Sequence, residues 1–143
     1  MRGLKFSPSI CFESTVPHLL LGQVNELAAK GDEPDVLLNV TNDGWFKGSA
    51  ILDLHFRCSV FRAIENRKPT VIAANTGFSA WIDGNGRVLK QGPRRQTTTL
   101  IAEAQPDGRT SPYRRMGDLL AGLCAGVCWV AAVVGVWTRR PPA

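Results

Sequence analysis

Cys11 is the residue of this sequence best placed to do covalent chemistry. It ends a short extended segment, residues 4–11, and a helical pattern begins about six residues later. A thiol at such a strand-to-helix turn lies at the carboxyl end of a sheet, where open α/β folds bind ligands. The positive end of the next helix dipole favours the thiolate. The position therefore predicts a nucleophile, and a small buried apolar residue is the alternative for a free cysteine.

Glu13 is the nearest titratable neighbour of Cys11 in the sequence. If the backbone stays extended, Glu13 lies on the Cys11 side and can orient a partner or accept a proton. A carboxylate that stabilises a helix start is the alternative. His18 and His55 are the only histidines, and each is interpreted as a helix residue rather than as a catalytic base. The Cys and His residues lack the spacing of a metal site, so we expect no metal and no cofactor.

The spacing of apolar residues predicts the elements that position Cys11. The first helix has one apolar face and a cap at Ser14 or Thr15, and the second begins at a Ser49 cap. The second helix is apolar on two sides, which favours a place between two layers. The predicted elements are a strand over 4–11, a helix over 17–31, a buried strand over 35–41, a helix from 49 to about 67, a strand over 70–75, a hairpin of 79–82 and 87–89, and a strand over 97–104.

Strands that alternate with helices and end in a hairpin predict an α/β fold with a mixed sheet. The first strand begins almost at the first residue, so a core strand sits at the chain terminus. We therefore expect one helix face and one sheet face to lack partners, as in a piece of a larger domain.

Residues 119–137 form a stretch of 19 residues without a charge. As a helix this stretch is about 28 Å long, close to the thickness of about 30 Å of a bilayer core. Arg114 and Arg115 precede it, and Arg139 and Arg140 follow it. The pattern predicts a membrane span, with a buried core helix as the alternative.

Composition excludes several classes of protein. Lys and Arg number 17 against 12 Asp and Glu, a net charge of +5, and no basic stretch is interleaved with aromatic residues, so we expect no nucleic-acid partner. Four cysteines in 143 residues are too few for a disulfide-stapled secreted scaffold.

Four segments of the sequence carry a more specific signal. In order along the chain they read ICFESTVPHL, LLNVTNDGWF, LHFRCSVFRAIENRKP and AANTGFSAWIDGNGRV. They resemble segments of the apolipoprotein N-acyltransferases, the membrane branch of the nitrilase (carbon–nitrogen hydrolase) superfamily. The resemblance implies the C-terminal half of a nitrilase-like α-β-β-α sandwich followed by one transmembrane helix. It divides the chain into a partial nitrilase-like domain, residues 1–112, and a C-terminal transmembrane helix with its tail, residues 113–143.

The resemblance also implies roles for individual residues. Cys11 resembles the family nucleophile, which takes an acyl chain from a phospholipid as a thioester and passes it to the N-terminal amine of a diacylglyceryl lipoprotein. Glu13 matches the family carboxylate that follows the nucleophile by two residues. The resemblance further implies that the protein is located in the bacterial inner membrane, with the nitrilase-like part facing the periplasm. The residues implied to bind substrate or support the site are Phe12, Trp45, Phe46, Arg62, Glu65 and Asn75.

The chain departs from the family in the rest of its Glu–Lys–Cys triad. The family glutamate and lysine lie well upstream of the cysteine strand, whereas only ten residues precede Cys11, with Lys5 as the sole lysine among them. We therefore expect the isolated chain to be inactive, either as a membrane-anchored fragment or as a subunit that complements a separate N-terminal chain. A plain amidase or carbon–nitrogen hydrolase, in which water replaces the amine, is the other alternative.

Overall fold

The computed structural model describes residues 3–103 and 105–138, and in them five strands form one mixed sheet of order β1-β2-β3-β4-β5. The first three strands are parallel to one another, β4 runs antiparallel to β3, and β5 runs antiparallel to β4. The strands are β1 (Phe6–Ile10), β2 (Val36–Thr41), β3 (Thr70–Ala74), β4 (Ala80–Ile82) and β5 (Val88–Gln91). The helices are α1 (Pro17–Ala29), α2 (Ile51–Asn66), α3 (Pro112–Met116) and α4 (Leu119–Thr138), with short 3-10 helices η1 (Cys11–Thr15) and η2 (Asp43–Phe46).

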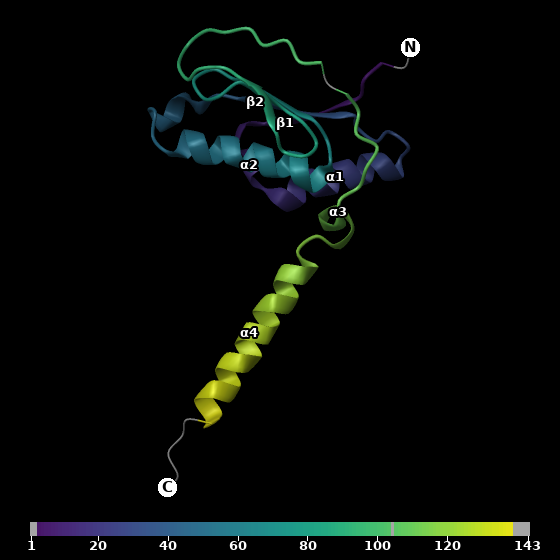
Figure 1. Ribbon diagram of the computed structural model, residues 1–143, viewed down its shortest axis with the longest axis vertical. Coiled ribbons are helices and arrows are strands. Elements are labelled where there is room, and N and C mark those ends of the chain that lie inside the picture. Colours follow the sequence, from purple (N-terminus) through teal and green to yellow (C-terminus); the bar gives the residue numbers. More distant parts are fainter. Residues whose placement is uncertain (1–2, 104, 139–143) are drawn as a thin grey trace.

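Helices α1 and α2 cover one face of the sheet, as Figure 1 shows. Leu20 and Val24 of α1 pack against Leu37 of β2. Ala63 of α2 packs against Ile72 of β3, and this second cluster extends to β4. Burial of these apolar side chains, at about 25 cal/mol per Å², holds the two layers together. The predicted α/β order, with a mixed sheet ending in a hairpin, is confirmed.

The opposite face of the sheet is open along β1 and at the carboxyl end of β2, whereas Val36 at the start of β2 is buried. Phe6, Ile10 and Val40 are 52 %, 67 % and 49 % exposed, whereas Ser7 and Ser9 point to the helix side and are buried. The register pairs Ile10 with Val40, so these apolar side chains are neighbours. An apolar sheet face without a partner is what the sequence predicted.

The outer side of α2 is also apolar and open. Leu54 and Phe61 are 60 % and 57 % exposed, and they lie seven residues apart, on one side of the helix. The stripe that faces the sheet carries Leu52, Phe56 and Val60. The two apolar stripes predicted for this helix are present, and only one of them is covered within the described residues.

Two helix caps were predicted wrongly. The residue before α1 is Val16 and the residue before α2 is Ala50, and neither makes a side-chain capping bond. Ser14 belongs to η1, where its hydroxyl donates to the carbonyl of Cys11 instead. Ser14 and Thr15, the residues predicted to cap the first helix, are part of the 3-10 helix η1 that follows β1.

The strand predicted over 97–104 is also wrong for its described part. Residues 97–103 form no strand, and their main link to the sheet is the Lys90 ammonium, which donates to the carbonyl of Ile101 at 2.8 Å. Threonine favours strands only where a neighbouring strand offers a ladder. Ala104 lies outside the described residues.

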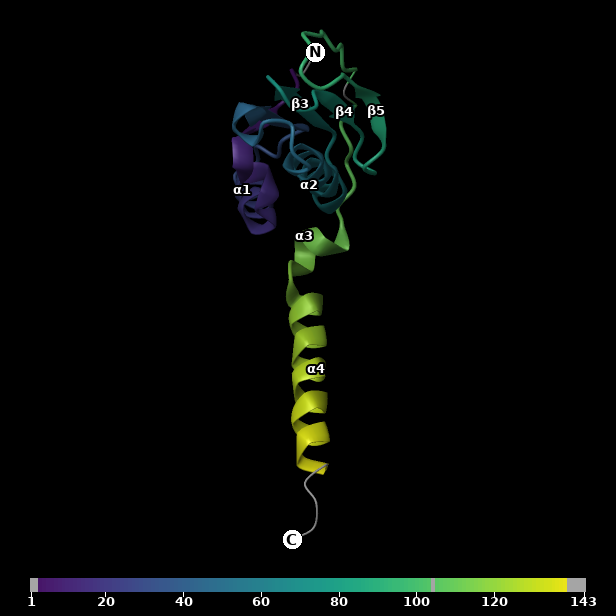
Figure 2. The ribbon, with the colours of Figure 1, turned by 90° about the vertical axis from the view of Figure 1, so that its left-hand side faces the viewer.

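Helix α4 leaves the domain from the side of the helix layer (Figure 2). It has 20 residues, an 18-residue window within it has a mean hydropathy of 2.4, and by length and composition it is long and apolar enough to cross a membrane. None of its residues packs on the domain. Arg139 and Arg140, predicted to flank the span, lie outside the described residues.

Short α3 ties this helix to the domain. The Arg114 guanidinium donates to Asn25 Oδ1 at 2.9 Å and to Glu33 Oε1 at 2.5 Å, and Asn25 donates back to the Arg114 carbonyl. The Ser111 hydroxyl donates to the carbonyl of Glu65 near the end of α2. The start of the apolar helix is thereby fixed beneath α1 and α2.

Candidate active site

The carboxyl ends of three parallel strands meet at one edge of the sheet. Cys11 follows β1, Asp43 follows β2 and Asn75 follows β3. The backbone N–H of Asn75 donates to the carbonyl of Thr41 at 3.2 Å, which joins the ends of β3 and β2. This is the edge at which α/β folds place their ligands. The predicted position of Cys11 at the end of a strand is confirmed.

Cys11 is half-buried and has a backbone φ of +50°. This left-handed conformation costs a residue with a Cβ about 1–2 kcal/mol. Three side-chain atoms surround the Cys11 carbonyl oxygen: Asn39 Nδ2 at 3.1 Å, His55 Nε2 at 3.1 Å and Ser14 Oγ at 3.3 Å. The surroundings therefore hold the strained turn in place.

Glu13 does not lie on an extended backbone, so that premise of the sequence analysis was wrong. The chain turns into η1 at Cys11, and Glu13 Oε2 accepts a hydrogen bond of 2.7 Å from the backbone N–H of Ile10. The carboxylate thus closes the turn from its solvent side. Its service as a proton acceptor remains a prediction.

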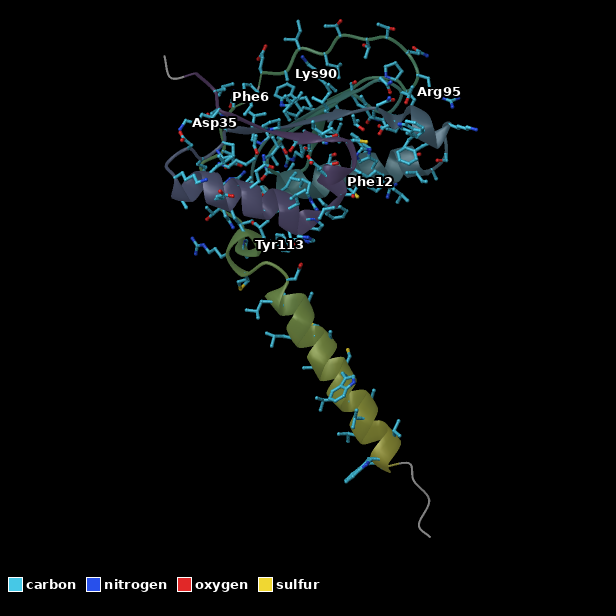
Figure 3. The ribbon with its side chains drawn as sticks, turned by 180° about the vertical axis from the view of Figure 1, so that it is seen from behind. Phe6, Phe12, Asp35, Lys90, Arg95 and Tyr113 are labelled. Carbon is cyan, nitrogen blue, oxygen red and sulfur yellow. The ribbon has the colours of Figure 1, made fainter. Side chains whose placement is uncertain are left out.

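Aromatic rings border the Cys11 turn. Phe12 lies at the end of β1 opposite Phe6, as Figure 3 shows. Its ring centroid is 5.8 Å from that of Phe46 and 5.5 Å from that of His55. Trp45, on the same loop as Phe46, is 82 % exposed. Phe12 and Phe46 therefore form an aromatic pair next to the Cys11 turn.

Arg62 and Glu65 lie elsewhere. They follow His55 along α2 by seven and ten residues, about 10 and 15 Å at 1.5 Å per residue. Their side chains pair at 2.7 Å, and burial raises the pKa of Glu65 while the nearby Arg62 opposes the rise. Because Ser111 bonds the Glu65 backbone, this pair lies beside α3 and not beside Cys11.

His55 and Asp43 lie against the site, although the sequence pattern predicted no role there for either residue. His55 Nδ1 is 2.9 Å from Asp43 Oδ1, and both side chains are only 4 % exposed. Two features of the sequence could have indicated a buried polar network at this place. Asn39 is a polar residue inside an apolar strand, and His55 shares one helix side with Leu52 and Ser59 at spacings of three and four residues.

No group of three or more His, Cys, Asp or Glu side chains could hold a metal ion within residues 3–103 and 105–138. The protein is thus an α/β protein with a mixed sheet, and its candidate site, with Cys11 and polar groups from the next two strand ends, lies at the carboxyl edge of that sheet. Residues 1–113 match the family model described as carbon-nitrogen hydrolase, and the chain belongs to this family.

The similar proteins include apolipoprotein N-acyltransferases. The chain is 34 % identical over 144 residues to the apolipoprotein N-acyltransferase of Rhodopirellula baltica, a match that covers 98 % of this chain and 25 % of the relative. It is 38 % identical over 125 residues to the apolipoprotein N-acyltransferase of Geobacter metallireducens, which covers 87 % of this chain and 23 % of the relative. The chain thus spans about a quarter of the length of these curated relatives.

Solved structures that resemble this chain include the nitrilase-superfamily protein Nit3 of Saccharomyces cerevisiae. It matches with a TM-score of 0.47 and 15 % identity, over 62 % of this chain and 33 % of that chain.

Proposed function

We propose that this chain carries the nucleophile of an apolipoprotein N-acyltransferase. The observation that carries the proposal is the position of Cys11 at the carboxyl edge of the sheet, in a chain whose relatives bear that name. The apolar helix α4 supports a reaction at a membrane. The donor is a phospholipid, the acceptor is a diacylglyceryl lipoprotein, and no cofactor takes part.

The reaction is ping-pong acyl transfer. The Cys11 thiolate attacks the ester carbonyl of the phospholipid, the C–O bond breaks, and the lysophospholipid alcohol leaves with a proton. The resulting thioester is then attacked by the N-terminal amine of the lipoprotein. The C–S bond breaks, an amide forms, the Cys11 thiolate is restored, and a base takes the proton of the amine.

Two functions must come from outside the contacts of Cys11. One is a base for the thiol proton, and the other is a cation for the tetrahedral oxyanion, a contribution of several kcal/mol in comparable sites. Lys5 lies at the amino end of β1, where its ammonium pairs with Asp32 at 3.0 Å. Among the described residues no lysine contacts Cys11. The 143-residue polypeptide alone is therefore inactive, and a glutamate- and lysine-bearing part, on this or a separate chain, completes it.

The open sheet face supports this proposal. Phe6, Ile10 and Val40 offer an apolar surface on which a second sheet can pack to complete an α-β-β-α sandwich. Residues 1–112 form the C-terminal half of that domain, and residues 113–143 form its membrane helix and tail.

The remaining site residues divide into two groups. Phe12, Trp45, Phe46 and Asn75 contact the acyl chain or the headgroup at the mouth of the site, because they lie at the same sheet edge as Cys11. Arg62 and Glu65, on α2, support the site indirectly, because the Glu65 carbonyl accepts from Ser111 and so helps to fix where the membrane helix begins.

Reconstitution tests this function. The purified chain in lipid vesicles, given a diacylglyceryl lipopeptide, should yield no N-acylated peptide alone, and should yield it once the glutamate- and lysine-bearing part is added or fused in front. Release of free fatty acid without N-acylation would instead identify a hydrolase. Steady turnover by the 143-residue chain alone would show that another base is at work, with His18 and His55 the first to substitute.

A further inference from the structure

We infer that His55, held by Asp43, is the positioning residue of the Cys11 turn, and that it carries its proton on Nε2 and donates it to the Cys11 carbonyl. The inference rests on the proposed function only for its catalytic consequence. It starts from a contact that joins residues 44 positions apart, His55 Nε2 to the Cys11 oxygen at 3.1 Å.

The position of the proton follows from the chemistry of the partners. A backbone carbonyl only accepts hydrogen bonds, so a bond from His55 Nε2 requires an N–H at that nitrogen. With the proton there, the Ser14 hydroxyl, 2.9 Å from Nε2, keeps its own hydrogen for the Cys11 carbonyl at 3.3 Å. With a bare Nε2, the lone pairs of Nε2 and of the carbonyl would face each other. In the first arrangement the Cys11 carbonyl accepts from both His55 and Ser14, and no lone pairs face each other. In the second, Ser14 donates to Nε2 and only Asn39 still donates to the carbonyl.

Asp43 fixes the other side of the imidazole ring. Its Oδ1 lies 2.9 Å from His55 Nδ1 and accepts the Thr41 hydroxyl at 2.8 Å. A Cβ at Gly77 would stand 2.0 Å from Asp43 Oδ2, so the carboxylate is packed against that glycine. Asp43 thus holds the ring at Nδ1, and the Cys11 carbonyl and Ser14 contact it at Nε2.

Ser14, His55 and Asp43 lie in the spatial order of a serine triad, but with a proton on Nε2 the Ser14 hydroxyl does not donate to the ring. Ser14 is 1 % exposed, and its hydroxyl is directed at the Cys11 carbonyl. A substrate therefore has no access to Ser14, and the network serves the turn that carries Cys11.

The consequence concerns the direction of the thiol. A residue at φ +50° departs from its preferred conformations, and it keeps that geometry only while its carbonyl is held. The backbone angles of Cys11 fix the direction of its Cα–Cβ bond and with it the sulfur. His55 acts on the reaction through Cys11 and touches no substrate.

The first test uses the unaltered 143-residue chain in detergent micelles. Nitrogen-15 NMR of the histidine rings distinguishes a protonated from a bare Nε2. We expect the His55 Nε2 signal at the protonated position at neutral pH. A bare Nε2 on His55 would overturn the inference, and this result requires no variant to fold.

The second test compares His55→Gln with His55→Met. Both lose the Nδ1 bond to Asp43 and have similar volumes, but only glutamine can donate to the Cys11 carbonyl. Amide exchange in residues 12–15 should rise about tenfold in His55→Met, the effect of one lost hydrogen bond, and stay within about threefold of the unaltered chain in His55→Gln. Exchange in β2 and β3 and in the control His18→Gln should not change.

Equal exchange in the Gln and Met variants would overturn the inference, because packing alone would then explain His55. Neither measurement involves acyl transfer. If both give the expected results and a completed enzyme still transfers no acyl group, the proposed function fails while the positioning role stands. In an active completed enzyme, His55→Met should lower kcat with KM unchanged, and His55→Gln should restore it.

Discussion

Cys11 and Cys58 are both half-buried cysteines, but only Cys11 lies at the edge where strand ends converge. Cys58 sits in the middle of α2, away from that edge. Their difference provides a matched pair for the chemistry at the residue scale.

We expect Cys11→Ala to abolish the acyl-thioester in the completed enzyme and Cys58→Ala to leave it intact, because a thioester needs the sulfur at the site. Mass spectrometry of the chain after incubation with phospholipid, before and after hydroxylamine, reads the thioester directly. Full activity in Cys11→Ala would show that the nucleophile is another residue.

Gly77→Ala should destabilise the domain by about 1–3 kcal/mol, the usual cost of an overpacked core. The added Cβ would meet Asp43, which cannot retreat without losing His55 and Thr41. Gly22→Ala is the control, since nothing lies within 4 Å of a Cβ there and alanine gains about 0.5–1 kcal/mol inside a helix. Urea unfolding followed by circular dichroism measures both variants, and equal stability of the two would refute the tight packing of Asp43.

The candidate site could be predicted from the sequence only in part. The position of Cys11 follows from a local pattern, an apolar strand and the helix after it. The contact of His55 with Cys11 joins residues 44 positions apart, and it depends on how α2 packs over η1. Such a contact has no local signal, so the sequence left His55 as an ordinary helix residue.

At the scale of elements, the long periodic patterns predicted correctly where strands and helices lie. β1, β2, β3, α1, α2 and α4 were expected within a few residues of their observed bounds. The errors lie where tertiary contacts override local preference. Ser14 does not cap α1 because its hydroxyl donates to the Cys11 carbonyl. Residues 97–99, all threonine, pair with no strand among the described residues.

The contacts of Arg114 with Asn25 and Glu33, which hold α3 against the domain, give a prediction about pH. Hydrogen bonds from Lys68 and then Arg114 lower the pKa of Glu33 below its ordinary value of 4.5. A carboxylate with a lowered pKa contributes its stabilisation above pH 4.5, and the contribution is lost as the pH falls through the lowered value. We expect α3 to loosen from α1 in that acidic range, seen as increased mobility of a spin label at Met116.

Glu33→Gln should have the same effect at neutral pH. Trypsin cleavage after Arg114 and Arg115 should rise about threefold to tenfold, since each partly exposed pair contributes about 0.2–1 kcal/mol. The control is Glu26→Gln, which breaks an exposed pair with Lys30 on α1 that does not touch α3. Equal cleavage in both variants would mean that Glu33 does not hold α3.

At the scale of the whole molecule, α4 and the helix layer determine which side of the domain faces a bilayer. The sheet lies on the far side of α1 and α2 from α4 (Figure 2). If α4 spans the inner membrane, the helix layer is the part of the domain next to the lipid headgroups.

We expect the Cys11 domain to face the periplasm and the chain after α4 to face the cytoplasm. A reporter that works only in the periplasm, fused after Ala143, should be inactive, and the same reporter fused ahead of the domain should be active. Membrane-impermeant thiol reagents applied from each side check the result independently. Periplasmic activity of the fusion after Ala143 would reverse the orientation.

The open sheet face has a consequence for the lifetime of the chain in a cell. Phe6, Ile10 and Val40 form the kind of exposed apolar patch that chaperones and proteases recognise. We expect the abundance of the chain to follow the supply of whatever covers that face. If the covering part is made as a separate chain, we expect copies of this chain in excess of that part to be degraded faster than copies whose sheet face is covered.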